Sequence, residues 1–186
     1  MKLKYILMAG LACATFASCN DYLDVDTPSK YDDKYVFGTE TEINRALNGV
    51  YAQLLNGNLY GDNFLTNFCL NSDVDFSTNA SETPASGAFR RFDCTSDAGQ
   101  LKKTWAYMGI EYANNFIYQL ENSPVYKAGN ANCEQMLGEA KVIRAMVYND
   151  LVDLWGDVPF TFTPTSEKKD YVTPIVSRDE IRTKLI

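Results

Sequence analysis

EAKVIRAMVYNDLVDLWGDVP, residues 139–159, is the stretch that decides the fold. Its apolar residues recur at steps of three and four, which predicts a helix with apolar contacts around much of its circumference. They are Val142, Ala145, Met146, Val147, Leu151, Val152, Leu154 and Trp155. Gly156 stands where a left-handed cap is expected and Pro159 lies just beyond, so we expect an abrupt end. Asn132, with Gln135 three residues later, is the predicted N-cap.

The same stretch resembles the signature helix of the SusD/RagB family, whose members are surface lipoproteins that bind glycans beside an outer-membrane transporter. The matching residues are Glu139, Ala140, Arg144, Ala145, Tyr148, Asp150, Leu151, Leu154, Trp155, Gly156, Asp157, Val158 and Pro159. Lys141 and Val142 depart from the family pattern, because larger apolar or aromatic residues are more usual there. Residues 46–51, Ala-Leu-Asn-Gly-Val-Tyr, also resemble the first helix of SusD-like proteins.

The N-terminus carries an export signal, residues 1–18. Lys2 and Lys4 precede an apolar run that is too short for a standard membrane span. The following residues, Phe-Ala-Ser-Cys at 16–19, resemble a bacterial lipobox, which predicts that Cys19 becomes the lipid-modified first residue, carrying acyl chains such as palmitate. The alternative is an ordinary secretory signal followed by an unrelated cysteine.

Residues 19–38 form a predicted extended tether. The segment is acidic and aromatic and has little helical periodicity. In SusD-like lipoproteins, an acidic stretch after the lipidated cysteine is associated with display on the cell surface. The resemblance therefore implies an outer-membrane protein, lipid-anchored and facing the exterior.

Composition restricts the chemistry. The 186 residues, 46% of them hydrophobic and 22% charged, are typical of a globular chain. The formal charge of −7 argues against a nucleic-acid backbone or another anionic polymer as ligand. The chain has no histidine, which removes Ser-His-Asp and Cys-His catalysis and the commonest general base. We predict a binding protein with no enzyme activity and no cofactor.

Three cysteines remain after the signal and the lipidated position: Cys69, Cys94 and Cys133. Their odd number and wide spacing fit neither a disulfide framework nor a zinc site. Buried free thiols are the favoured interpretation, and one disulfide is the alternative.

Residues 39–186 are predicted to be a helical domain. Thr39 and Glu42 have capping-box spacing, and the amphipathic helix after them is expected to end at Gly57. Its apolar positions are Ile43, Ala46, Leu47, Val50, Tyr51 and Leu54. Residues 60–70 fit neither a helical nor a strand period.

A second helix is expected to begin at Asp97 and Gln100, which again have capping spacing, and to end at residues 122–124, Asn-Ser-Pro. Two apolar stripes run along it. One comprises Trp105, Met108, Tyr112, Phe116 and Leu120, and the other Ile110, Ala113 and Ile117.

After Trp155 the sequence predicts a short extended stretch at 158–163 and a polar segment to Pro174. Ser177 and Glu180 then predict a helix that begins near Arg178. The resemblance implies that these elements form antiparallel helix pairs packed in tetratricopeptide-like fashion, an all-α fold. It also implies that the chain is the N-terminal portion of a longer SusD-like domain.

Residues 71–99 form a long loop whose composition suits a sugar ligand. Sugars stack on aromatic rings, and their hydroxyls bond to Asp, Asn and Arg side chains. The candidate ligand-binding residues are Asp73, Asp75, Phe76, Phe89, Arg90, Arg91 and Phe92. The alternative is that the phenylalanines pack the loop onto the helices and the arginines pair with surface acids.

Other acidic groups are interpreted as structural. Asp73, Asp75 and Ser77 open an EF-hand-like spacing, but Thr78 replaces its glycine, so we predict no metal site. A catalytic role is the alternative for three aspartates, which could act as the paired carboxylates of a glycoside hydrolase: Asp150, Asp153 and Asp157. We interpret them instead as salt-bridge and turn partners, and we expect Arg144 to pair with an acid on a neighbouring helix.

The resemblance implies that the protein binds an extracellular glycan, a poly- or oligosaccharide, and delivers it to a SusC-like, TonB-dependent transporter. Three alternatives remain at this level. They are a tetratricopeptide-like lipoprotein scaffold for protein partners, a non-functional fragment and, more weakly, a lipid-anchored glycoside hydrolase. The sequence does not name the glycan.

Overall fold

The structure is a computed structural model that describes residues 32–57, 59–61 and 106–185. The helices and strands of the described residues lie within one compact unit, Asp33–Ile186. The helices are α3 (Asp33–Val36), α4 (Glu40–Leu54), α6 (Tyr107–Asn122), α7 (Pro124–Lys127), α8 (Ala131–Trp155), the 3-10 helix η3 (Thr165–Glu167) and α9 (Arg178–Leu185). The two short strands are β1 (Val158–Pro159) and β2 (Ile175–Val176).

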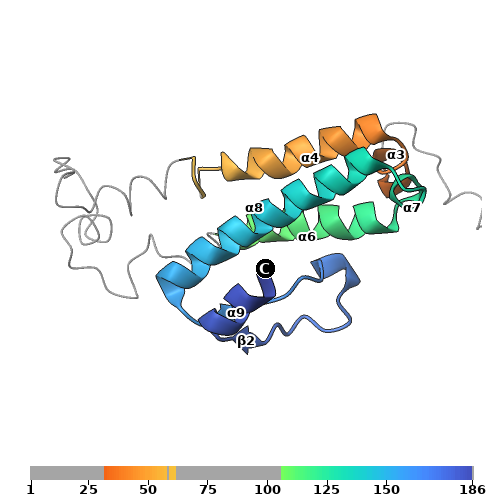
Figure 1. Ribbon diagram of the computed structural model, residues 1–186. Helices are drawn as coiled ribbons and strands as arrows, with labels where there is room; N and C mark the ends of the chain where they lie inside the picture. Colours follow the sequence, from red (N-terminus) through yellow and green to blue (C-terminus); the bar gives the residue numbers. More distant parts are fainter. Residues whose placement is uncertain (1–31, 58, 62–105, 186) are drawn as a thin grey trace, which may run out of the picture. The chain divides into compact units, whose positions relative to one another are not determined.

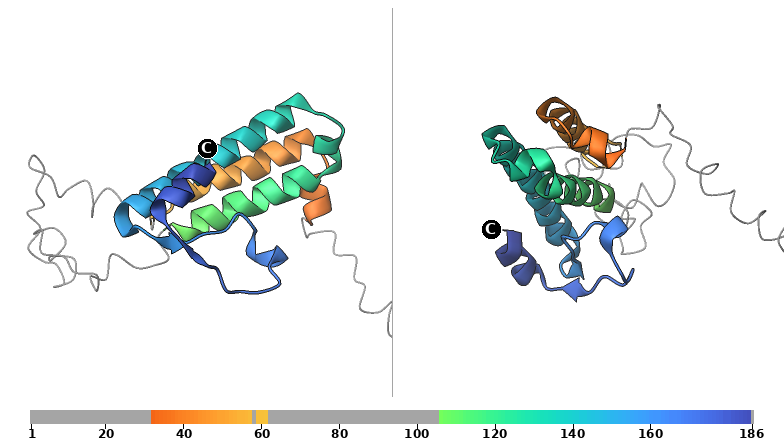
Figure 2. Two further views of the ribbon diagram at one scale, coloured as in Figure 1. Left: turned by 60° about the horizontal axis from the view of Figure 1, so that its bottom comes forward. Right: turned by 90° about the vertical axis from the view of Figure 1, so that its right-hand side faces the viewer.

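Helices α4, α6 and α8 lie side by side along their length (Figure 1). The chain reverses between α4 and α6 and again, through the short α7, between α6 and α8. Figure 2 shows α9 against the C-terminal part of α8, away from α4. The described residues thus form antiparallel helix pairs, as the sequence predicts.

Helix α4 begins at the predicted capping box. The Thr39 side chain accepts a hydrogen bond of 3.3 Å from the backbone N–H of Glu42. The helix ends at Leu54, three residues before the predicted Gly57, and turns follow it. Its buried residues Ile43 and Leu47 belong to the predicted apolar stripe.

The N-cap of α8 is Asn130, so the prediction of Asn132 is wrong by two residues. The Asn130 side chain accepts from the backbone N–H groups of Asn132, at 2.9 Å, and Cys133, at 3.2 Å. Asn132 lies in the first turn, and its amide donates to Glu40 at 2.7 Å, which ties α8 to the start of α4. At the other end the helix stops at Gly156 as predicted, with a φ of 71°, but its ψ of −121° lies outside the left-handed helical region, so the predicted left-handed cap is wrong.

Two hydrophobic clusters form the core, and α8 contributes to both. The first comprises Phe37, Ile43, Leu47, Val50, Ala113, Phe116, Ile117, Leu120, Cys133, Met136, Leu137, Ala140 and Ile143. The second comprises Leu59, Ala106, Ile110, Val147, Tyr148, Leu151, Val152, Val158, Phe160 and Ile181. The buried residues of α8 recur at steps of three and four along one face, so the prediction of apolar contacts around much of its circumference is wrong.

Some predicted apolar positions are exposed instead. On α8 the side chains of Val142 and Met146 are 68% and 41% exposed, because the buried face follows Ile143, Val147 and Leu151. On α6 the stripe of Ile110, Ala113 and Ile117 is buried, whereas Met108 and Tyr112 of the other predicted stripe are exposed. Trp105 lies outside the described residues.

The segment after α8 returns along the helices. Strand β1 pairs antiparallel with β2, with Val158 opposite Val176, so the predicted extended stretch is partly a strand. Helix α9 begins at Arg178 as predicted, and the backbone N–H of Glu180 donates to the Ser177 hydroxyl at 3.4 Å. Ile181 of α9 is fully buried. Within the described ranges, no helix combines the length and apolar character needed to cross a membrane.

Candidate functional site

The segment Phe160–Thr163 is held against α6 and α8 by buried polar side chains. The Tyr148 hydroxyl donates to the Thr161 carbonyl at 3.0 Å and accepts from the Thr161 N–H at 3.2 Å. The Asn114 amide donates to the same carbonyl at 3.1 Å. Tyr148 is fully buried, and Asn114 nearly so. The segment therefore has a fixed position, because its backbone groups are paired with side chains of two helices.

Arg144 lies one helical turn before Tyr148, on the same face of α8. Its side chain is 7% exposed, its Nη1 donates to Asn114 Oδ1 at 3.0 Å, and its Cζ lies 3.8 Å from the centroid of the Phe162 ring. The predicted acid partner on a neighbouring helix is wrong: within the described part of the chain Arg144 has an amide and a ring. Its Nε has no hydrogen-bond partner there.

The electrostatic consequence of this burial is a lowered pKa, although the guanidinium stays charged at neutral pH. Burial lowers the pKa of Arg144 to about 10, although the fields of Tyr148 and Glu121 act in the opposite direction. A buried guanidinium without a carboxylate is costly, because removal from water penalises the charged form.

Three aromatic rings line up beside this arginine. The Phe160 centroid lies 4.9 Å from that of Tyr148 and 4.8 Å from that of Phe162, which meets it edge-on. Such tilted contacts are favourable for aromatic pairs. Phe162 remains 37% exposed and is the outermost of the three rings.

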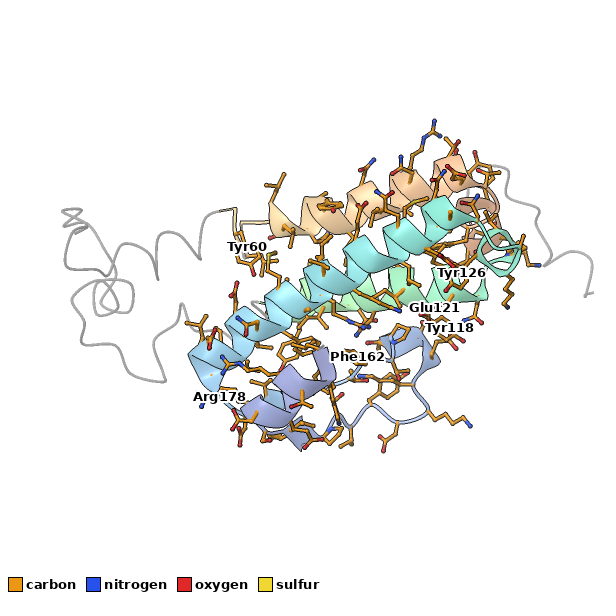
Figure 3. The ribbon with its side chains drawn as sticks, viewed as in Figure 1. Tyr60, Tyr118, Glu121, Tyr126, Phe162 and Arg178 are labelled. Atoms are coloured by element: carbon orange, nitrogen blue, oxygen red, sulfur yellow. The ribbon has the colours of Figure 1, made fainter. Side chains whose placement is uncertain are left out.

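A groove of about 590 Å³ opens beside Arg144 and Phe162, between α6, α8 and α9. It is lined by Ile117, Tyr118, Glu121, Lys141, Val142, Arg144, Ala145, Phe162, Lys184 and Leu185. Figure 3 shows Tyr118 and Glu121 at one end and Phe162 at the other. We call it the α6–α8–α9 groove.

Ion pairs and hydrogen bonds surround this groove. Lys141 pairs with Glu121 at 3.2 Å, and Lys184 pairs with Glu180 at 2.7 Å. The Tyr118 hydroxyl donates to Glu167 of η3 at 2.9 Å. Because both lysines have carboxylate partners, Arg144 is the lining cation without one among the described residues.

A smaller, more polar groove of about 310 Å³ lies between α4 and α8. Glu40 accepts from Asn130 and Asn132 there, and these hydrogen bonds lower the pKa of its carboxyl. Glu139 accepts from Gln135 on its own helix and from the Tyr51 hydroxyl. In the described ranges, no group of three or more His, Cys, Asp or Glu side chains is placed to hold a metal ion.

The aspartates at the end of α8 make structural contacts, as predicted. Asp150 accepts from the Tyr60 hydroxyl, and Asp153 pairs with Arg182 of α9. Asp157 accepts from the backbone N–H of Arg178 at 3.0 Å and so caps the start of α9.

The predicted ligand-binding residues Asp73, Asp75, Phe76, Phe89, Arg90, Arg91 and Phe92 lie outside the described residues, as do Cys19, Cys69 and Cys94. Cys133 is described, and the prediction of a buried free thiol is confirmed for it. Burial raises the pKa of that thiol, with a smaller contribution from Glu40.

Comparison with known proteins decides the family. A family model described as "Starch-binding associating with outer membrane" matches residues 21–181, which is most of the chain. The chain belongs to the SusD-like family. The resemblance on residues 139–159 is thereby confirmed.

Sequence and structure comparisons each find relatives of this SusD-like chain. SusD-like protein P25 of Formosa agariphila is 25% identical over 173 residues, 88% of this chain and 32% of that protein. The structure of a SusD superfamily protein from Bacteroides vulgatus has a TM-score of 0.66 at 21% identity. The match covers 80% of this chain and 33% of that protein. A SusD-like carbohydrate binding protein from Bacteroides fragilis has a TM-score of 0.59 at 19% identity. The match covers 80% of this chain and 30% of that protein. The predicted tetratricopeptide-like helical fold is confirmed, and the chain spans about a third of each relative's length.

The SusD-like chain should lose stability in alkali. Burial raises the pKa of Tyr148 to about 12 and that of Tyr107 to about 12, and burial with the Asp150 contact raises the pKa of Tyr60. Unfolded tyrosine titrates near pH 10. The folded state favours the neutral phenols, so the free energy of unfolding should fall as pH rises from about 10 to about 12. Arg144, whose pKa burial lowers, opposes this trend over the same range.

Urea unfolding followed by circular dichroism between pH 9 and 11.5 measures this dependence. Tyr148→Phe should show a shallower slope, because one raised phenol is removed. A stability that is constant or rises over this interval would contradict the assignment of the buried phenols.

Proposed function

We propose that the protein is a cell-surface lipoprotein that binds an extracellular poly- or oligosaccharide and delivers it to a TonB-dependent outer-membrane transporter. The observation that carries this proposal is the family match over residues 21–181, with its description as starch-binding and associated with the outer membrane. The Bacteroides fragilis relative is a SusD-like carbohydrate binding protein, which is consistent with this proposal. This function requires binding and release, and no bond is broken.

The proposed contacts to the glycan come from the loop at 71–99. A neutral sugar offers apolar ring faces and many hydroxyls, so its recognition needs aromatic surfaces beside charged or amide groups. The residues of this loop that offer such groups are Asp73, Asp75, Phe76, Phe89, Arg90, Arg91 and Phe92. Phe89 and Phe92 are assigned to stacking, and the arginines and aspartates to the hydroxyls.

The proposed organisation of the chain places the binder at the membrane. Residues 1–18 are a lipoprotein signal peptide, Cys19 carries the lipid, and residues 19–38 are a tether. Each buried methylene of an acyl chain adds about 0.8 kcal/mol of membrane affinity, and two or more chains anchor firmly. Residues 39–186 are the N-terminal part of the SusD-like domain. The relatives' greater length supports this division.

Phe89→Ala and Arg90→Ala test the proposed contacts. Each should weaken binding about tenfold, which corresponds to about 1.4 kcal/mol, because one stacking surface or one charged donor is lost. Affinity electrophoresis of the signal-free protein in gels containing soluble starch, or another neutral glycan that the wild type binds, measures the change.

Ser86→Ala is the matched control within the same loop and should bind as the wild type does. Wild-type affinity in both the Phe89 and the Arg90 variants would contradict the site assignment. Retention of protein partners without any retention by glycans would favour the scaffold hypothesis over glycan binding.

A further inference from the structure

The chain contains two Asn-Gly pairs, at residues 48–49 and 56–57. In such a pair the asparagine side chain can react with the backbone nitrogen of the glycine, which has no Cβ to shield that nitrogen or to restrict the backbone. Asn48 and Gly49 lie within α4, whereas Asn56 and Gly57 lie in the turn that follows it. The two pairs therefore present the same chemistry in two backbone conformations.

The reaction needs no other protein group. The glycine nitrogen attacks the asparagine Cγ, so an N–Cγ bond forms, the Cγ–Nδ2 bond breaks, and the glycine amide proton leaves with the side-chain nitrogen as ammonia. Water then opens the resulting succinimide ring. Opening at Cγ gives aspartate, and opening at the former backbone carbonyl carbon gives isoaspartate, whose main chain runs through Cβ and Cγ and is longer by one atom.

The helical conformation protects Asn48. An α-helix pairs each interior N–H with the carbonyl four residues earlier, and this pairing holds the nitrogen of Gly49 in the helical ladder. Attack on the Cγ of Asn48 requires this part of α4 to open, which costs free energy. Asn48 is exposed and Asn56 is half-buried, so exposure alone would favour reaction at Asn48. Backbone conformation favours the opposite order.

The helix has ended before Asn56. The N–H groups of Leu55 and Asn56 donate to carbonyls three residues earlier, at 3.2 and 3.1 Å, in place of the helical pairing. Gly57 is exposed, and a Cβ placed on it would meet no neighbouring atom of the described residues within 4 Å, so the ring has room to form there. We propose that the Asn56-Gly57 pair is a site of spontaneous deamidation and isoaspartate formation in the folded protein, and that the pair at 48–49 is not.

The turn after α4 depends on the main chain of Asn56. Its carbonyl oxygen accepts from the N–H groups of Leu59, at 2.8 Å, and Gly61, at 3.1 Å. A Cβ on Gly61 would lie 2.2 Å from the Leu55 carbonyl oxygen, so the chain passes through this turn in close contact. In isoaspartate the accepting carbonyl leaves the main chain and one atom is inserted. The modified turn therefore no longer positions Leu59, which is 2% exposed in the second hydrophobic cluster.

Peptide mapping of aged protein tests the proposal. The signal-free protein, extended to the length of its relatives, is incubated in the folded state in mildly alkaline buffer and digested with trypsin, which releases residues 46–90 with both pairs in one peptide. Electron-transfer fragmentation then distinguishes asparagine, aspartate and isoaspartate at each position. The initial rate at Asn56 should exceed that at Asn48 by at least about tenfold, because only Asn48 requires local opening of a helix. In urea the two rates should agree within about twofold, since neither pair is then held by the fold.

Glutamine variants test the effect on the fold, because the longer side chain closes a larger ring much less readily. Ageing should lower the urea midpoint of the wild type and of the control Asn48→Gln, and it should leave that of Asn56→Gln unchanged. The site is overturned by folded-state rates at Asn48 that equal or exceed those at Asn56, or by no conversion at Asn56 while protein in urea converts at both positions. The loosened turn is overturned by an equal ageing loss in Asn56→Gln, or by an unchanged midpoint in wild type that carries isoaspartate at position 56.

Discussion

Tyr148→Ala is expected to lower the free energy of unfolding by about 3–5 kcal/mol, as large-to-small changes of buried aromatic residues do. Tyr148 is fully buried in the second cluster, beside Phe160, and it holds both backbone groups of Thr161. Because small domains are stable by only about 5–15 kcal/mol, such a loss is a large part of the total. Urea unfolding followed by circular dichroism measures it.

Tyr148→Phe separates the hydroxyl from the ring. It leaves the Thr161 N–H without its partner, which is expected to cost about 1–3 kcal/mol. Tyr51→Phe is the matched control: the Tyr51 hydroxyl bonds to Glu139 on an exposed surface, so its loss should change stability by less than about 0.5 kcal/mol. Equal effects of the two substitutions would show that the buried hydroxyl does not hold the return segment.

Cys19→Ala is expected to abolish membrane retention. The proposed lipid is attached at that thiol, and its acyl chains supply the proposed membrane affinity. Expressed with its own signal in a bacterium that processes lipoproteins, the wild type should sediment with membranes and incorporate labelled palmitate. The variant should do neither.

The control for this experiment is Cys13→Ala, which removes a thiol that the proposed cleavage would release with the signal peptide. It should remain lipidated and sediment with membranes as the wild type does. Sedimentation of the Cys19 variant with membranes, together with palmitate incorporation, would contradict the assignment of the anchor.

Local patterns in the sequence predicted much of the described fold. The capping pairs at Thr39 and Ser177 each depend on residues a few positions apart, and both are confirmed. The end of α8 at Gly156 was also predicted, although the conformation of that glycine was not. The N-cap of α8 was harder to place, because Asn130 and Asn132 are both good caps. The Asn132 side chain donates a hydrogen bond to Glu40 instead, and this contact joins residues 92 positions apart in the sequence.

The surroundings of Arg144 could not be predicted from sequence periodicity, because they consist of tertiary contacts between residues far apart in the sequence. Asn114 lies 30 residues before it in the sequence and Phe162 lies on the return segment. One signal was present: Arg144 and Tyr148 share a helical face, and Asn114 is a polar residue between apolar positions of α6. The sequence pattern also did not predict that Val142 is exposed, because a spacing of three and four residues fits two adjacent faces of one helix.

The family resemblance, by contrast, could be drawn from thirteen matching positions in one helix and its cap, and the family match confirms it. The glycan-contacting residues could not be derived in that way. The sequence around Phe89 and Arg90 has no helical or strand period from which their orientation could be predicted, and both lie outside the described residues.

Isothermal titration calorimetry of the signal-free protein, extended to the length of its relatives, with soluble starch and a series of other neutral glycans tests the central claim most directly. The account predicts saturable binding to at least one neutral glycan, with wild-type affinity retained by Ser86→Ala and about tenfold lost in Phe89→Ala. Absence of binding to every glycan in the series, by protein whose circular dichroism shows a folded helical chain, would contradict the proposed function.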